Sequence, residues 1–199
     1  GRFARRLIPR HPSPTPHPSL LAKGEKGRRG EGEALNAQHL ILNTQHSTPY
    51  TLDSTLDSSL YALFAFGAFS ADDPRIQATM RSVITRLWVQ TEVGGIARYE
   101  GDFYFRRSGD IARVPGNPWF ICTLWAAQWY IAQARTRKDL TTALELLLWA
   151  ARRALPTGIL PEQLHPETGE PLSVAPLTWS HAEFVITTLD YLEQWSRLR

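Results

Sequence analysis

A stretch without a polar face constrains the fold more than any other feature of the sequence. From Pro118 to about residue 133, apolar side chains point to every side of a helical projection: Trp119, Phe120, Ile121, Leu124, Trp125, Trp129, Tyr130 and Ile131. A helix of this kind is stable only when other elements cover it all round. The sequence therefore predicts a buried helix at 118–133, inside a layer of others.

Helices with a single apolar face are predicted on both sides of this buried one. Asp73-Pro74 is an N-cap followed by proline at the first helical position, so a helix begins there. Asn117 and Asp139 are expected to cap two further helices, and Ser180 forms a capping-box pattern with Glu183. No strand alternation is apparent. We predict an all-α fold in which outer helices cover inner ones.

Charge and composition divide the chain near residue 47. Residues 1–47 hold 8 basic and 3 acidic side chains, whereas the remainder holds 14 and 16. The first part is rich in proline and glycine, so residues 1–47 are expected to be a largely irregular, basic N-terminal segment or insert. Residues 48–199 are expected to form the folded domain. Because that domain is mildly acidic, we do not expect nucleic acid as a partner.

Several classes of protein are excluded by simpler counts. One cysteine, Cys122, rules out an intramolecular disulfide, and its apolar surroundings indicate an inert buried thiol. No apolar run approaches the roughly 20 residues of a membrane span, so no membrane partner is expected. His165 and His181 lack a second ligand at helical spacing, so we expect neither a metal nor a cofactor. The low cysteine content favours a cytoplasmic location.

Two long loops combine ionisable groups with a tryptophan near a predicted helix start. The first holds Arg98-Tyr99-Glu100-x-Asp102 and then Asn117-Pro118-Trp119-Phe120. The second holds Leu160-Pro161-Glu162-Gln163 and then Leu177-Thr178-Trp179-Ser180-His181-Ala182. Flat aromatic faces suit the apolar side of a sugar ring, and a carboxylate can act on a glycosidic bond. Simpler roles stay open: Arg98 could pair with Glu100 or Asp102, and the tryptophans could pack under their loops.

These four motifs, in this order, resemble the C-terminal half of glycoside hydrolase family 15, the glucoamylase family, and its bacterial branch in particular. The resemblance spans about Leu56 to Leu192. It implies the C-terminal half of an (α/α)6 barrel that releases glucose from the non-reducing ends of α-glucans with inversion. It makes Glu162 the general base. The substrate-binding residues that it implies are Arg98, Tyr99, Asp102, Trp119, Gln163 and Trp179.

The sequence departs from the family at the second catalytic carboxylate. The family's general acid lies in an upstream Trp-Glu-Glu-type motif, but this chain has no tryptophan before Trp88 and no Glu-Glu pair. We therefore expect a fragment that is nearly inactive alone and whose partner is the missing N-terminal half of the barrel. Without that half, inner helices such as 118–133 are expected to expose apolar faces.

Two alternatives remain from the sequence. A non-catalytic, glucoamylase-like scaffold or regulatory domain would keep the apolar helices without using the sugar site. A hydrolase of the same family could instead cleave trehalose, isomaltose or dextran, because the far side of the substrate pocket is not in this chain.

Overall fold

The computed structural model describes residues 54–199, and these form one compact unit dominated by helices. The helices are α1 (Ala62–Ala65), α2 (Pro74–Leu87), α3 (Phe120–Gln133), α4 (Thr141–Arg152) and α5 (Thr178–Arg197). Two single-turn 3-10 helices, Ser58–Tyr61 and Arg137–Leu140, lead into α1 and α4. The predicted all-α class is confirmed.

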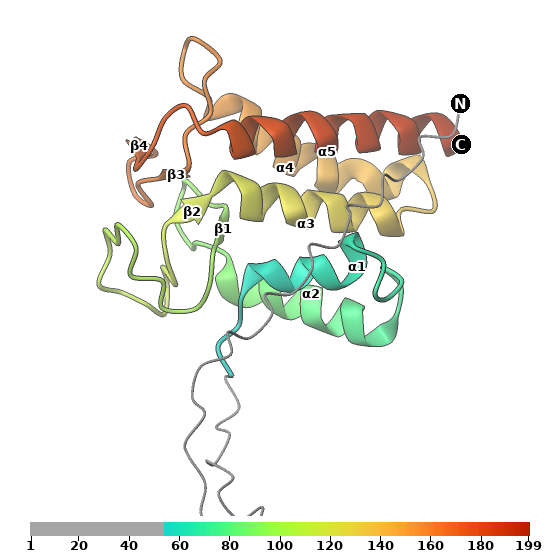
Figure 1. The fold of residues 1–199 in the computed structure, drawn as a ribbon, viewed down its shortest axis with the longest axis horizontal. Coiled ribbons are helices and arrows are strands. Elements are labelled where there is room, and N and C mark those ends of the chain that lie inside the picture. Colours follow the sequence, from blue (N-terminus) through green and yellow to red (C-terminus); the bar gives the residue numbers. More distant parts are fainter. Residues whose placement is uncertain (1–53) are drawn as a thin grey trace, which may run out of the picture. The chain divides into compact units, whose positions relative to one another are not determined.

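The apolar segment predicted to be buried is α3, and it lies at the centre of the described unit (Figure 1). It packs against α4 and α5 on one side and against Ser58–Tyr61 and α2 on the other. Ten of its residues are buried, including Phe120 and Leu124, which have no exposed surface. The amphipathic helices α2 and α4 turn apolar faces toward the core, so outer and inner helices alternate along the chain.

A small antiparallel sheet, which the sequence did not predict, closes one end of the helices. Its strands are β1 (Ile96–Ala97), β2 (Pro118–Trp119), β3 (Gln163–Leu164) and β4 (Pro171–Leu172), in the order β1-β2-β3-β4. Trp119 pairs with Ile96 on one side and with Gln163 on the other. Two-residue strands are too short to show an alternating pattern, which is why no strand alternation is apparent in the sequence.

The predicted helix starts differ in accuracy. Asp73 caps α2 as expected, accepting a hydrogen bond from the backbone N–H of Arg75 at 2.9 Å. Asn117 does not cap α3, because Pro118 and Trp119 belong to β2 and the helix begins at Phe120. Asp139 forms a capping box with Thr136 at the 3-10 helix, one turn before α4.

The predicted capping box at the start of α5 is absent. The helix begins at Thr178, so Ser180 and Glu183 both lie inside it. The Ser180 hydroxyl donates to the carbonyl of Pro161 at 2.8 Å, which ties α5 to the loop before β3. A tertiary partner thus replaces the local one.

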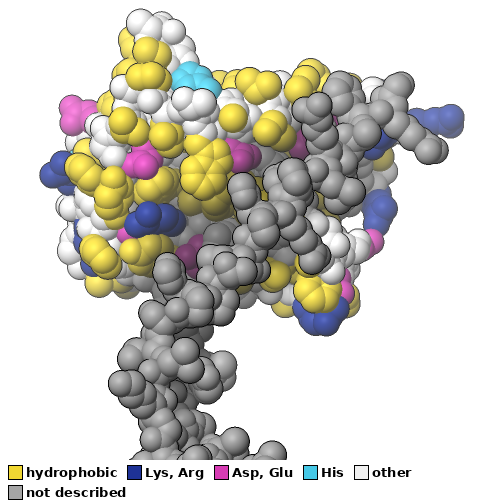
Figure 2. Space-filling view, in the orientation of Figure 1, with side chains coloured by type: hydrophobic (Ala, Val, Ile, Leu, Met, Phe, Trp, Pro, Cys, Tyr) yellow, Lys and Arg dark blue, Asp and Glu magenta, His cyan; other side chains and the backbone are white. Residues whose placement is uncertain are grey.

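Of the two helices α3 and α5, α5 carries the exposed apolar side chains and α3 does not, contrary to the sequence-based expectation. In Figure 2 hydrophobic side chains gather over the part of the molecule where Figure 1 places α5. The large side chains of α5 that are at least two-fifths exposed are Trp179, Val185, Ile186, Leu189, Leu192 and Trp195. No helix among residues 54–199 is long and apolar enough to cross a membrane.

Candidate active site

The small sheet brings the two motif-bearing loops together at one end of the helices. β2 lies between β1, which leads into Arg98 and Tyr99, and β3, which begins at Gln163. The backbone N–H of Phe120 also donates to the carbonyl of Glu162 at 3.3 Å. Two motifs that are far apart in the sequence therefore share one framework.

Arg98 and Asp102 form a two-pronged ion pair in the first loop. Arg98 Nε lies 3.0 Å from Asp102 Oδ2, and Arg98 Nη2 lies 2.9 Å from Asp102 Oδ1. Asp102 is 1% exposed and also accepts the backbone N–H of Tyr104. Burial alone would lower the pKa of the Arg98 guanidinium, but the bond to Asp102 and its charge raise it. The ion pair left open by the sequence is present with Asp102, whereas Glu100 pairs with Arg86.

Three aromatic rings surround the Arg98 guanidinium. Its central carbon lies 4.9 Å from the ring centre of Tyr99, 5.2 Å from that of Tyr104 and 4.8 Å from that of Trp119. Such cation–π contacts hold a guanidinium in place and are strengthened where water is excluded. Trp119 is only 4% exposed, so its main contacts in this structure are with protein groups. Its role in sugar binding stays a prediction.

Glu162 lies on the edge of the second loop, directly before β3, and is partly exposed. Its backbone N–H donates to the carbonyl of Val174 at 2.9 Å, which holds the loop around it. One carboxylate oxygen, Oε2, lies 3.4 Å from Nε2 of Gln163. A carboxylate that is backbone-anchored and partly open to solvent could take a proton from a water molecule.

Behind Glu162 lies a buried pair of amides, in which the predicted site residue Gln163 contacts Asn117, a link that was not predicted. Gln163 has no exposed surface, and its Oε1 accepts a hydrogen bond from Nδ2 of Asn117 at 2.8 Å. Asn117, assigned from the sequence to a helix cap, also donates to the carbonyl of Phe105 at 2.9 Å. Phe105 has a φ of 54°, a left-handed conformation that costs a non-glycine residue about 1–2 kcal/mol. Only the neighbouring Pro-Trp motif hinted that Asn117 belongs to the site.

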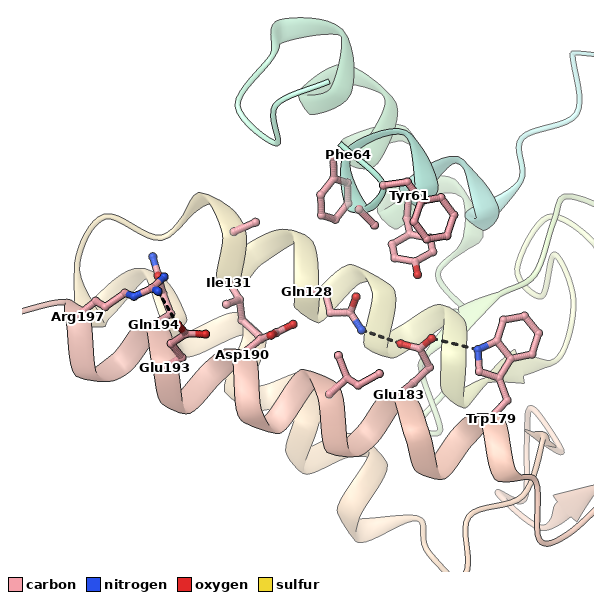
Figure 3. A pocket seen from close by; sticks show the side chains of 14 residues that line it. Tyr61, Phe64, Gln128, Ile131, Trp179, Glu183, Asp190, Glu193, Gln194 and Arg197 are labelled. Atoms are coloured by element: carbon pink, nitrogen blue, oxygen red, sulfur yellow. Dashed lines mark hydrogen bonds and ion pairs between the residues drawn. The ribbon is translucent and has the colours of Figure 1, made fainter. Parts of the chain in front are cut away.

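Trp179 lies apart from this cluster in the first turn of α5 and is 51% exposed. Its indole N–H donates to Glu183 Oε1 at 3.0 Å, and its ring meets Trp125 edge-on at 5.8 Å. Glu183 in turn accepts a hydrogen bond from Gln128 at 2.7 Å (Figure 3). The spacing of four residues between Trp179 and Glu183 is the sequence signal that puts both on one helix face.

Trp179, Glu183 and Gln128 line a groove of about 610 Å³ between α1, α3 and α5 (Figure 3). Burial raises the pKa of Tyr61 in this groove to about 12, and the charge of Glu183 adds a smaller contribution in the same direction. Burial and the neighbouring carboxylates Glu193 and Glu183 raise the pKa of Asp190. Neither Arg98 nor Glu162 lines the groove, so the structure assigns the predicted site residues to two separate places.

The histidines have structural partners. His181 Nε2 accepts the backbone N–H of Leu160 at 3.0 Å, and His165 Nδ1 accepts those of Glu167 and Thr168. Within residues 54–199 no group of three or more metal-ligating side chains is close enough to hold an ion.

Comparison with known proteins finds one family. The model of glycosyl hydrolases family 15 matches residues 27–148. An uncharacterized glycosyl hydrolase of Methanocaldococcus jannaschii is 34% identical over 145 residues, covering 68% of this chain and 22% of that protein. A glucoamylase of a Clostridium species is 31% identical over 160 residues, covering 76% of this chain and 21% of that protein. The chain thus spans about a fifth of the length of these curated relatives.

A solved structure supports the same relationship. The crystal structure of a bacterial glucoamylase complexed with acarbose matches with a TM-score of 0.60 and 29% identity, covering 72% of this chain and 22% of that one. Glucoamylases are (α/α)6 barrels, and the double layer of helices described above is part of such a barrel, as predicted.

Proposed function

Because the chain belongs to glycosyl hydrolases family 15, we propose that it carries the general-base half of an inverting glucosidase that acts on chain ends. The observation that supports this most is the pairing of Trp119 with Gln163. Through that pairing, the Arg98–Asp102 cluster and the Glu162 carboxylate belong to one framework at the end of the helices. Charged donors, aromatic rings and a solvent-accessible carboxylate are what a sugar-cleaving site needs.

In the proposed reaction Glu162 removes a proton from the water that attacks the anomeric carbon. A second carboxylic acid, from the missing N-terminal half of the barrel, protonates the leaving oxygen from the other side of the sugar. In inverting enzymes the two carboxyl groups stand about 6.5–9.5 Å apart, which leaves room for the water. Arg98, Tyr99, Asp102, Trp119, Gln163 and Trp179 are proposed to bind the sugar or to hold the groups that do.

The proposed substrates are the non-reducing ends of α-glucans such as maltooligosaccharides. This rests on two relatives, the Clostridium protein named glucoamylase and the bacterial glucoamylase solved with acarbose. Trehalose, isomaltose and dextran are the alternatives within the family. A non-catalytic scaffold role is the alternative outside it.

Glucose release from maltotriose, trehalose, isomaltose and dextran tests the proposal. The assay uses the chain alone and a longer polypeptide that restores the rest of the barrel. We expect the longer protein to release glucose and the chain alone to be slower by about 10²–10⁴-fold, the usual contribution of a positioned acid. Glu162→Gln should lower the rate of the longer protein by a similar factor.

Glu167→Gln is the matched control, because Glu167 lies in the same loop but is exposed and pairs with Arg113. It should leave the rate unchanged. Full activity in Glu162→Gln would remove Glu162 from the mechanism. Failure of the longer protein to cleave any of the four sugars would favour the scaffold role.

A further inference from the structure

We propose that Asn117 is a positioning residue that sets, through Gln163, how the Glu162 carboxylate is held. The three side chains form a relay that begins at the backbone carbonyl of Phe105 and ends at Glu162 Oε2. The catalytic meaning of this relay rests on the proposed function, whereas its geometry does not.

The direction of the relay is determined at its first member. The Phe105 carbonyl lies 2.9 Å from the Asn117 amide and can only accept a hydrogen bond. Asn117 must therefore present its NH2 group there, because its oxygen would be repelled. Asn117 is 1% exposed, so water cannot take the place of either partner.

The same NH2 group directs Gln163. Its second hydrogen points to Gln163 Oε1, at 2.8 Å. With its oxygen bound in this way, Gln163 can offer only its Nε2 to Glu162, and the two atoms lie 3.4 Å apart. This contact determines which oxygen of the Glu162 carboxylate faces Gln163. Among the described residues Glu162 Oε1 has no hydrogen-bond partner, which leaves that oxygen for a water molecule.

The side-chain oxygen of Asn117 has no hydrogen-bond partner among the described residues, which indicates that position 117 requires a hydrogen-bond donor. Asn117 Oδ1 is buried and has no partner in the described part of the chain. A buried acceptor without a hydrogen bond is destabilising, so asparagine is a costly residue for mere packing. Its two donated hydrogen bonds are the feature that an apolar residue of similar size would not supply.

A double-mutant cycle in the full chain tests the relay without requiring activity. Asn117→Asp has the same shape but replaces the donor by an acceptor, so Gln163 must turn over and direct Oε1 at Glu162. Glu162→Gln then offers an N–H to that oxygen and relieves the repulsion. We expect the two changes to be coupled by at least about threefold in the urea unfolding equilibrium constant, although among the described residues the side chains of Asn117 and Glu162 are linked only through Gln163.

The same double-mutant cycle is then measured in a Gln163→Met chain, since this substitution keeps the side-chain volume and removes the amide. There the coupling between positions 117 and 162 should vanish. Additive effects of Asn117→Asp and Glu162→Gln with Gln163 present would overturn the proposal, as would equal coupling in both backgrounds.

Side-chain amide NMR provides a second readout if Asn117→Asp does not fold. The Gln163 NH2 signals should move in both Asn117→Ala and Glu162→Gln. Those of Gln194, whose amide donates to Ala134 at 3.0 Å, should stay in place as an internal control. Unchanged Gln163 signals in Asn117→Ala would reject the relay. A confirmed relay together with an active Glu162→Gln enzyme would reject only the proposed function.

Discussion

At the scale of single residues, Gly116 shows how closely the two ends of the first loop approach each other. A Cβ atom at this position would lie 2.8 Å from Cβ of Asp102 and 3.2 Å from Cβ of Ala97. Neither neighbour can withdraw easily, because Asp102 is tied to Arg98 and Ala97 belongs to β1. The absence of a side chain at Gly116 therefore determines where Asp102 can lie.

Gly116→Ala should lower the free energy of unfolding by about 1–3 kcal/mol, the usual cost of overpacking. Gly109→Ala is the control, because nothing lies within 4 Å of the added atom there. It should change stability by no more than about 0.5 kcal/mol. Urea unfolding followed by circular dichroism measures both variants, and equal effects would contradict the steric argument.

Cys122 predicts how stability changes at high pH. Its thiol is 1% exposed, and burial raises its pKa to about 12 from an ordinary value of 9.0. Between these two values the folded chain keeps the proton that the unfolded chain loses, so stability is complete below about pH 9 and is lost as the pH rises toward 12. Tyr61, with its pKa raised to about 12, acts in the same direction from pH 10 upward.

Raising the pH from 8 to 10.5 should therefore lower the free energy of unfolding, with roughly 1–2 kcal/mol of the loss due to Cys122. In Cys122→Ala this part of the loss should disappear, whatever the variant does to stability at pH 8. Denaturant titrations at both pH values give the comparison. Identical losses in the two proteins would mean that the thiol ionises as readily in the folded state as in the unfolded one.

At the scale of elements, helix starts were predictable where the cap is local. Asp73 caps α2 with its own side chain and the N–H of Arg75, two residues away. Asn117 and Ser180 carry the right chemistry for caps but use it on partners far along the chain, Gln163 and Pro161. Sequence patterns cannot distinguish a local cap from a distant contact, because the distant hydrogen-bonding partner is brought near only by folding.

The element most exposed to solvent is α5, and it predicts how the isolated chain behaves. Val185, Leu189 and Leu192 are 55%, 60% and 55% exposed. Apolar surface of this extent favours association. We expect the chain to self-associate at micromolar concentration and the double variant Leu189→Gln/Leu192→Gln to shift it toward monomer.

Sedimentation equilibrium measures this association. Leu144→Gln on the outer helix α4 is the control, since Leu144 is 38% exposed but lies on a different helix from the exposed leucines of α5. It should leave the association constant unchanged. If the unsubstituted chain is monomeric at micromolar concentration, the exposed face of α5 does not mediate self-association.

At the scale of the whole molecule, helices alternate between an inner and an outer position, and the site lies at the end that the sheet closes (Figure 1). The chain spans about a fifth of the length of its curated relatives. The predicted boundary between residues 1–47 and 48–199 falls outside the described residues and stays a prediction. So does the cytoplasmic location.

The helical class, the buried position of α3 and the family could all be predicted from the sequence. The buried position of α3 depends on residue types within one apolar stretch, and the family depends on four short motifs in a fixed order. Three features could be seen only in the folded chain: Trp119 pairs with Gln163, Asn117 contacts the residue that follows Glu162, and α5 is the exposed helix. These features join residues tens of positions apart, or depend on which neighbours are present, so no local pattern encodes them.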